Sequence, residues 1–274
     1  MLEFAFMRKA LILGFLLSIM IPIIGIVMVN RKTSMIGDAL SHTALAGVGM
    51  GLILGFDPLL GSAIICVIAA FLIELIRKKF PQYGDMATAV IMSTGLGIAA
   101  ILSDFAPGGN SFESYLFGSI SSVTTMDIIN TSIVFVLVLA LSISRYSSLL
   151  AIAIDPNTAR LSGVKVKSLD FVFTFLAAIT IALSVKVIGA LMVTSLIVLP
   201  VATSLIVAKS YKATFFITIT LGVIYMMLGL ILSYQFDIKP GGAIVVNAIV
   251  GMLLFASYKK LKKKSQNNKT QQSV

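Results

Sequence analysis

The only histidine of the chain lies four residues after an acidic residue, in the stretch GDALSH at residues 37–42. On a helix this spacing places Asp38 and His42 on one face, about one turn apart. A neutral imidazole and a carboxylate are good zinc ligands, and both also suit manganese. The pair is therefore a candidate site for a divalent metal ion. A structural role is the alternative, with Asp38 capping the helix and His42 hydrogen-bonded to a neighbouring helix.

A second stretch with a defined local pattern is DPNTARLSGV at residues 155–164. It predicts a short helix with Asp155 as the N-cap, Pro156 at the first helical position and Gly163 at the C-terminal stop. Arg160 is expected to be exposed on it. Such a helix has no core of its own, so it is a candidate for docking a partner; a structured loop without a partner is the alternative.

The third stretch, residues 186–204, combines small and hydroxyl-bearing residues in an apolar run. Small residues permit close approach of membrane helices. The hydroxyl groups could line a polar path through a membrane or form hydrogen bonds between helices, and both roles remain open for Thr194, Ser195, Thr203 and Ser204.

These residues must be positioned by membrane helices. Hydrophobic residues make up 58% of the 274 residues, charged residues 12%, and the mean hydropathy is +1.04. A spanning helix needs about 20 mostly apolar residues, and the apolar runs here are continuous, which excludes the alternating pattern of a β-barrel. We predict an all-α polytopic membrane helical bundle. The candidate spans are 10–29, 39–55, 59–76, 87–103, 127–144, 171–187, 190–208, 213–234 and 242–258.

The second candidate span is rich in small residues, so eight or nine transmembrane helices are expected. With a cytoplasmic C-terminus, every Lys and Arg except Arg8, Lys9, Lys186 and Lys239 falls on the cytoplasmic side. This orientation is favoured because cytoplasmic loops of membrane proteins carry an excess of Lys and Arg. The basic residues thus sit at the ends of spans, a placement that reflects topology and not a phosphate-binding patch. The expected surroundings are membrane lipid, and no nucleic acid is expected as a partner. The expected organisation is a transmembrane domain at 1–264 and a disordered polar tail at 265–274.

Several sequence patterns are absent. There is no Gly-x-x-x-x-Gly-Lys-Ser/Thr, so the chain binds no nucleotide through a P-loop, and there is no His-Glu-x-x-His of a zinc protease. The single cysteine, Cys66, permits no internal disulfide and no thiolate metal site. We therefore expect neither an enzyme nor a permanently bound cofactor.

Taken together, these stretches resemble the metal-ion family of ABC permeases, which includes the ZnuB-type zinc permeases and the manganese permeases. The family pattern is matched at 37–42, at YLFG (115–118), at 155–164 and from Gly-Ala-Leu to Pro-x-Ala-Thr at 189–203, in the family's order. The resemblance implies that Asp38 and His42 coordinate the transported ion and that 155–164 is the cytoplasmic coupling helix.

The resemblance also implies a homodimer in a bacterial cell membrane, two cytoplasmic ATP-binding subunits that hydrolyse ATP, and an extracytoplasmic metal-binding protein that delivers the ion. The region 186–204 looks more like the zinc members, which favours Zn²⁺ over Mn²⁺ as the substrate. The alternative function is an ATP-independent secondary transporter or channel for divalent cations. That function would require further intramembrane carboxylates or broken helices, and Glu74 is the one additional candidate.

Overall fold

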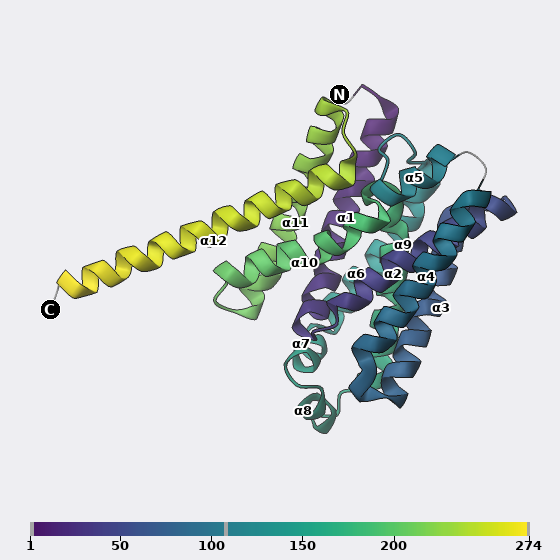
Figure 1. Cartoon of the computed structure of the whole chain (residues 1–274). Helices are drawn as coiled ribbons and strands as arrows, with labels where there is room; N and C mark the ends of the chain where they lie inside the picture. The colour runs from purple at the N-terminus through teal and green to yellow at the C-terminus, as the bar shows by residue number, and fades with distance from the viewer. Residues whose placement is uncertain (1–2, 107–108, 273–274) are drawn as a thin grey trace.

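The computed structural model describes residues 3–106 and 109–272 and is a bundle of helices (Figure 1). In the described residues, nine helices are long and apolar enough to cross a membrane. They are α1 (Ala5–Asn30), α2 (Ser34–Leu54), α3 (Pro58–Lys79), α4 (Gly84–Phe105), α6 (Thr125–Ser144), α9 (Val166–Ile188), α10 (Ala190–Val207), α11 (Tyr211–Phe236) and α12 (Pro240–Gln272). Eight of them match a predicted span within five residues at each end, and α12 begins near its predicted start but extends beyond residue 258. The predicted helical bundle is confirmed, with the higher of the two expected span numbers.

The remaining helices are short and lie in the connections. They are η1 (Pro81–Tyr83), α5 (Gly109–Phe117), α7 (Tyr146–Ile154) and α8 (Pro156–Leu161). The sequence Pro107-Gly108-Gly109-Asn110 is typical of a turn, and residues 107–108 lie outside the described part. The short helices α7 and α8 hang below the bundle at one end, and α5 lies at the other (Figure 1).

The helix α2 lies in the centre of the bundle, where it contacts α3, α4, α9 and α10. Its small residues allow this burial because backbones approach one another without intervening side chains. A Cβ added to Gly47 of α2 or to Gly61 of α3 would lie 2.3 Å from the carbonyl oxygen of the other glycine. A Cβ on Gly95 of α4 would lie 2.1 Å from Cγ2 of Thr43. The small residues that made eight spans an alternative to nine therefore belong to a closely packed central span.

Three glycines join the ends of α5, α9, α10 and α12. The helices α9 and α10 are separated by Gly189 alone, whose φ of +90° favours glycine. A Cβ on Gly189 would lie 2.5 Å from the backbone nitrogen of Gly118, and one on Gly118 would lie 2.2 Å from the carbonyl oxygen of Val187. A Cβ on Gly241 would lie 2.1 Å from the carbonyl oxygen of Ile188. This glycine junction (Gly118, Gly189 and Gly241) fixes where α10 enters the bundle.

Ion pairs between distant segments agree with the predicted orientation. The guanidinium group of Arg31 donates two hydrogen bonds, of 2.8 and 3.0 Å, to the carboxylate of Asp170. The predicted orientation places both residues on the cytoplasmic side. Lys239 lies 3.2 Å from Glu113, and the orientation places both on the outside.

The disordered tail at 265–274 stays a prediction. The helix α12 continues to Gln272 and extends away from the bundle (Figure 1). Residues 261–272 contain neither glycine nor proline and are rich in lysine and glutamine, which have high helix propensity. Residues 273–274 lie outside the described part.

Candidate metal site

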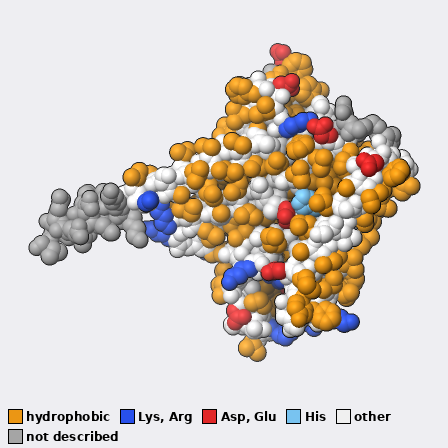
Figure 2. Space-filling model, in the orientation of Figure 1, with side chains coloured by type: hydrophobic (Ala, Val, Ile, Leu, Met, Phe, Trp, Pro, Cys, Tyr) orange, Lys and Arg blue, Asp and Glu red, His pale blue; other side chains and the backbone are white. Residues whose placement is uncertain are grey.

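The side chains of Asp38 and His42 face one another on α2. Nε2 of His42 lies 3.7 Å from Oδ1 of Asp38. This separation exceeds a normal hydrogen bond and is near the roughly 3.3 Å that separates two ligands on a tetrahedral zinc ion with bonds of about 2.0–2.1 Å. The side chains are 17% and 29% exposed for His42 and Asp38, respectively. Figure 2 shows the single histidine, in pale blue, beside an acidic side chain on the open face of the bundle.

A hydroxyl group from another span holds the carboxylate. Oγ1 of Thr194, in the first turns of α10, donates a 2.9 Å hydrogen bond to Oδ1 of Asp38. The bond joins residues 156 positions apart in the chain, so it depends on the glycine junction that positions α10. Thr194 thereby orients the carboxylate that faces His42.

The structural alternative for the pair does not hold in this arrangement. The N-cap of α2 is Thr33, so Asp38 lies inside the helix and does not cap it. Nδ1 of His42 is buried and has no hydrogen-bond partner among the described residues. A buried polar atom without a partner costs about 1–3 kcal/mol, and such atoms in folded proteins call for a functional explanation.

The pair alone would make only part of a metal site. Within residues 3–106 and 109–272 no group of three or more His, Cys, Asp or Glu side chains could hold an ion together. Because the pair lies on an open face, further ligands can approach it from outside the chain.

The other hydroxyl-bearing residues of the third stretch separate into two groups. Thr194 donates a hydrogen bond to Asp38 of the candidate pair, and the adjacent Ser195 is half-buried. Thr203 and Ser204 are fully buried. Thr203 donates to the carbonyl oxygen of Leu199, and Ser204 accepts a 2.6 Å hydrogen bond from Thr218 of α11. Neither Thr203 nor Ser204 lines an open path in this structure. The hydroxyl of Thr203 is bonded to the backbone of its own helix, and that of Ser204 is bonded to the neighbouring helix α11.

The segment 155–164 folds as the sequence predicts. The carboxylate of Asp155 accepts hydrogen bonds from the hydroxyl of Thr158 and the backbone N–H of Asn157, and these bonds hold the pKa of Asp155 below its ordinary value. Pro156 opens α8 and Arg160 is exposed.

A glycine-dependent motif ends α8. Gly163 has φ +82° and donates to the carbonyl oxygen of Arg160, while Val164 donates to that of Ala159. This pair of bonds is the Schellman motif, which requires a left-handed residue at the position of Gly163. The short helix therefore has a cap at each end.

Three of the four sequence stretches converge in space. Residues 37–42 meet the start of α10 through Asp38 and Thr194, and residues 115–118 meet it through Gly118 and Gly189. The fourth stretch, 155–164, lies apart at the end of the molecule that carries α7 and α8 (Figure 1).

Sequence reasoning missed a buried ion pair near the outer end of the bundle. Nζ of Lys186 lies 2.7 Å from Oδ2 of Asp127. The only available signal was the pattern Thr124-x-x-Asp127, which is typical of a capping box at a helix start and does form one at α6. Nothing in that pattern identifies Lys186 as the partner.

Comparisons with known proteins show the family of the chain. A family model described as the ABC 3 transport family matches residues 3–260. The chain belongs to the ABC 3 transport family. Two relatives illustrate the family. A protein of Treponema pallidum named "Probable metal transport system membrane protein" is 35% identical over 93% of this chain and 97% of its own length. The ZnuB zinc uptake membrane protein of Haemophilus influenzae is 30% identical over 89% and 94%.

Other family members carry manganese names. The MntC manganese transport membrane protein of Listeria monocytogenes is 27% identical over 91% of this chain and 89% of its own length. A solved structure, PsaBC from Streptococcus pneumoniae in complex with Fab, superposes with a TM-score of 0.83 at 28% identity, covering 95% of this chain and 96% of that one. The resemblance to metal-ion ABC permeases and the multi-pass membrane location are confirmed.

Proposed function

We propose that this chain is the permease subunit of an ABC importer for divalent metal ions, with Zn²⁺ preferred over Mn²⁺. The observation that carries the proposal is the pair Asp38 and His42, held 3.7 Å apart on a central membrane helix and oriented by Thr194. Ionisable side chains within a span are costly and mark ion pathways. The names of the metal-transporting relatives support the same substrate class.

The incomplete site supports a homodimer. Two copies that met at the open face would bring two carboxylates and two imidazoles around one ion. Four such ligands suit the tetrahedral coordination of zinc, whereas manganese favours oxygen ligands in octahedral geometry. This donor set is the physical reason for preferring zinc.

The absence of a P-loop sequence and the presence of the capped helix α8 indicate the partners. Without a P-loop sequence, the energy must come from separate cytoplasmic ATP-binding subunits. The capped helix α8, with exposed Arg160, is the proposed contact for these subunits through residues 155–164. An extracytoplasmic metal-binding protein would deliver the ion to the opposite side.

The test is uptake of radioactive zinc into proteoliposomes that contain the chain and its ATP-binding subunits. Asp38→Asn and His42→Ala should each abolish ATP-dependent uptake without loss of assembly. Lys239→Gln, which removes an exposed ion pair on the outer side, is the matched control and should retain uptake. Normal uptake by both site variants would remove the pair from the pathway, and uptake that needs no ATP would favour the secondary transporter or channel.

A further inference from the structure

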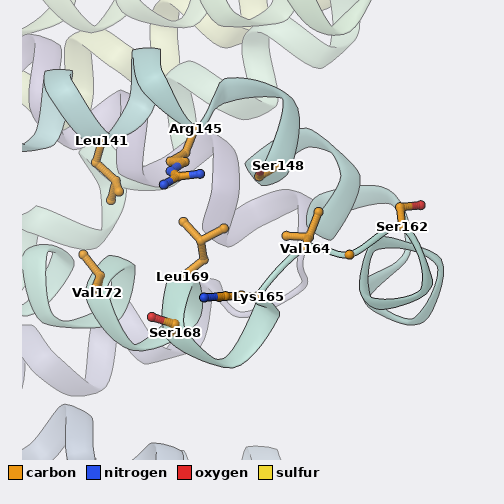
Figure 3. A pocket seen from close by; sticks show the side chains of 10 residues that line it. Leu141, Arg145, Ser148, Ser162, Val164, Lys165, Ser168, Leu169 and Val172 are labelled. Carbon is orange, nitrogen blue, oxygen red and sulfur yellow. The ribbon is translucent and has the colours of Figure 1, made fainter.

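A cavity of about 540 Å³ lies at the cytoplasmic ends of α6 and α9, next to the end of α8 (Figure 3). Its walls come from the last turn of α6, the start of α7, the segment after α8 and the first turns of α9. The cavity is distinct from the metal pair, which lies on the open face of α2. The proposed transport function does not account for it.

The cavity holds two positive charges and no negative one in the part of the chain that the structure describes. Arg145 and Lys165 line it, and Figure 3 shows their charged ends on either side of Leu169. Neither side chain forms an ion pair with any described residue, whereas Arg31 nearby on the same side of the membrane is paired with Asp170. Two cations facing one space repel each other, and an anion between them would relieve that repulsion.

Two further side chains of the cavity can donate hydrogen bonds to phosphate oxygens. The hydroxyl groups of Ser148 and Ser168 line the same space, whereas the hydroxyl of Ser162 donates to the carbonyl oxygen of Thr158. An arginine fork and a lysine ammonium both bind phosphate, the first through paired hydrogen bonds and the second as a point charge. The ligand chemistry is therefore a phosphate group.

The apolar wall indicates the source of that phosphate. Leu141, Leu169 and Val172 line the side of the cavity formed by the two spans. Val172 is 40% exposed and Ile143 on α6 is 73% exposed, so an apolar surface continues from the cavity along the bundle. A free phosphate has no apolar part that could contact this surface. A lipid would place its headgroup in the cavity and its acyl chains along α6 and α9.

We propose that this cavity binds the phosphate headgroup of an anionic phospholipid from the cytoplasmic leaflet. Because Ser162, Gly163 and Val164 form part of its wall, the bound lipid would brace the end of α8. Only this last consequence rests on the proposed function of α8; lipid binding itself does not.

The chain contains no tryptophan, which allows a direct test. A Val172→Trp variant of the full chain, assembled with its ATP-binding subunits in nanodiscs, carries a fluorescent reporter at the cavity. Brominated phosphatidylglycerol should quench this tryptophan with an apparent affinity about thirtyfold higher than brominated phosphatidylcholine, as expected for two cations near an anionic lipid. Tryptophans of the partner subunits are replaced or subtracted with a complex that lacks Val172→Trp.

Charge variants test the assignment. Arg145→Gln with Lys165→Gln should remove the preference for phosphatidylglycerol, and the conservative pair Arg145→Lys with Lys165→Arg should restore it. Lys209→Gln with Lys212→Gln is the matched control, because it removes two cytoplasmic charges outside the cavity and should leave the preference unchanged. Equal quenching by both lipids would overturn the proposal. So would a loss of lipid preference in Lys209→Gln with Lys212→Gln as large as that in Arg145→Gln with Lys165→Gln.

Two further arms distinguish other ligands. Millimolar inorganic phosphate should not displace the brominated lipid, and displacement would identify a soluble phosphate site in place of a lipid site. The lipid preference should be the same with and without the ATP-binding subunits. Its disappearance on their addition would show that acidic groups of those subunits occupy the cavity, which would also overturn the proposal.

Discussion

Lys186 of α9 and Asp127 of α6 form a buried ion pair, with Nζ 2.7 Å from Oδ2. The same Oδ2 accepts a 2.7 Å hydrogen bond from the backbone N–H of Thr124, which closes the capping box at the start of α6. One carboxylate therefore joins the beginning of α6 to the end of α9. Since α9 ends at the glycine junction two residues later, this pair also anchors the entry of α10.

Removing one member of this pair should destabilise the protein. Lys186→Met leaves the buried carboxylate of Asp127 without its cation, and breaking a buried pair in this way costs about 3–5 kcal/mol. The free energy of unfolding, measured in detergent by chemical denaturation, should fall accordingly. Lys239→Met breaks an exposed pair whose side chains are 56% and 48% exposed, and its effect should stay within about 1 kcal/mol. Equal effects of the two variants would contradict the structural role of Lys186.

The hydrogen bond from Thr194 to Asp38 should contribute to metal affinity. Hydrogen bonds to charged groups contribute about 1.5–3 kcal/mol, so Thr194→Val should weaken zinc binding roughly tenfold to hundredfold by releasing the carboxylate. Thr194→Ser keeps the hydroxyl and should bind nearly as tightly as the unchanged protein. Isothermal titration of the purified permease measures both variants. An affinity that is unchanged in Thr194→Val would show that Asp38 needs no orientation or does not bind the ion.

The left-handed conformation of Gly163 should matter for coupling to ATP hydrolysis. Gly163→Ala introduces a strain of about 1–2 kcal/mol at φ +82°, which loosens the Schellman motif at the end of α8. Transport and metal-stimulated ATPase activity should both fall. So should disulfide crosslinking from Arg160→Cys to the ATP-binding subunits, an assay in which the native Cys66 is silent because it is buried.

Gly55→Ala provides the control for that experiment. Gly55 has φ +72°, and a Cβ added to it would have no neighbouring atom within 4 Å, as is also true of Gly163. It ends α2 on the outer side, so the substitution imposes the same kind of strain away from α8. Crosslinking lost equally in both variants would assign the effect to general destabilisation.

The contact between Gly47 and Gly61 should tolerate no side chain. Gly47→Ala places a Cβ 2.3 Å from the carbonyl oxygen of Gly61, and such overpacking costs about 1–3 kcal/mol. Gly97→Ala adds a methyl group with no atom within 4 Å and should be neutral or slightly stabilising, because alanine favours the helix. Thermal unfolding in detergent compares the two, and a Gly47→Ala variant as stable as Gly97→Ala would disprove the close packing of α2 on α3.

The spans were predictable because lipid imposes one rule on every segment of this kind: an apolar run long enough to cross must be a helix. The pair Asp38 and His42 was predictable for a similar reason, since i and i+4 positions share a helix face whatever surrounds them. The caps of α8 depend only on local backbone geometry. The residue types of Asp155, Pro156 and Gly163 are therefore enough to predict where the helix begins and ends.

Contacts between spans could not be predicted in this way. Thr194 was one of four equivalent hydroxyl-bearing candidates, and only the crossing of α10 over α2 separates it from Thr203 and Ser204. The partner of Lys186 likewise depends on how α6 packs against α9. No local pattern specifies such crossings, because they depend on close approaches between distant parts of the chain, such as that of Gly118 after α5 to Gly189 between α9 and α10.

The presence of one histidine per chain makes coordination countable by spectroscopy. In a protein prepared without a histidine tag, every imidazole scattering path at a bound metal must come from His42. One such path per ion would describe an ion held by a single copy, and two would describe an ion shared between copies. A ratio of scatterers thus reports the symmetry of the binding site without any need to resolve the assembly itself.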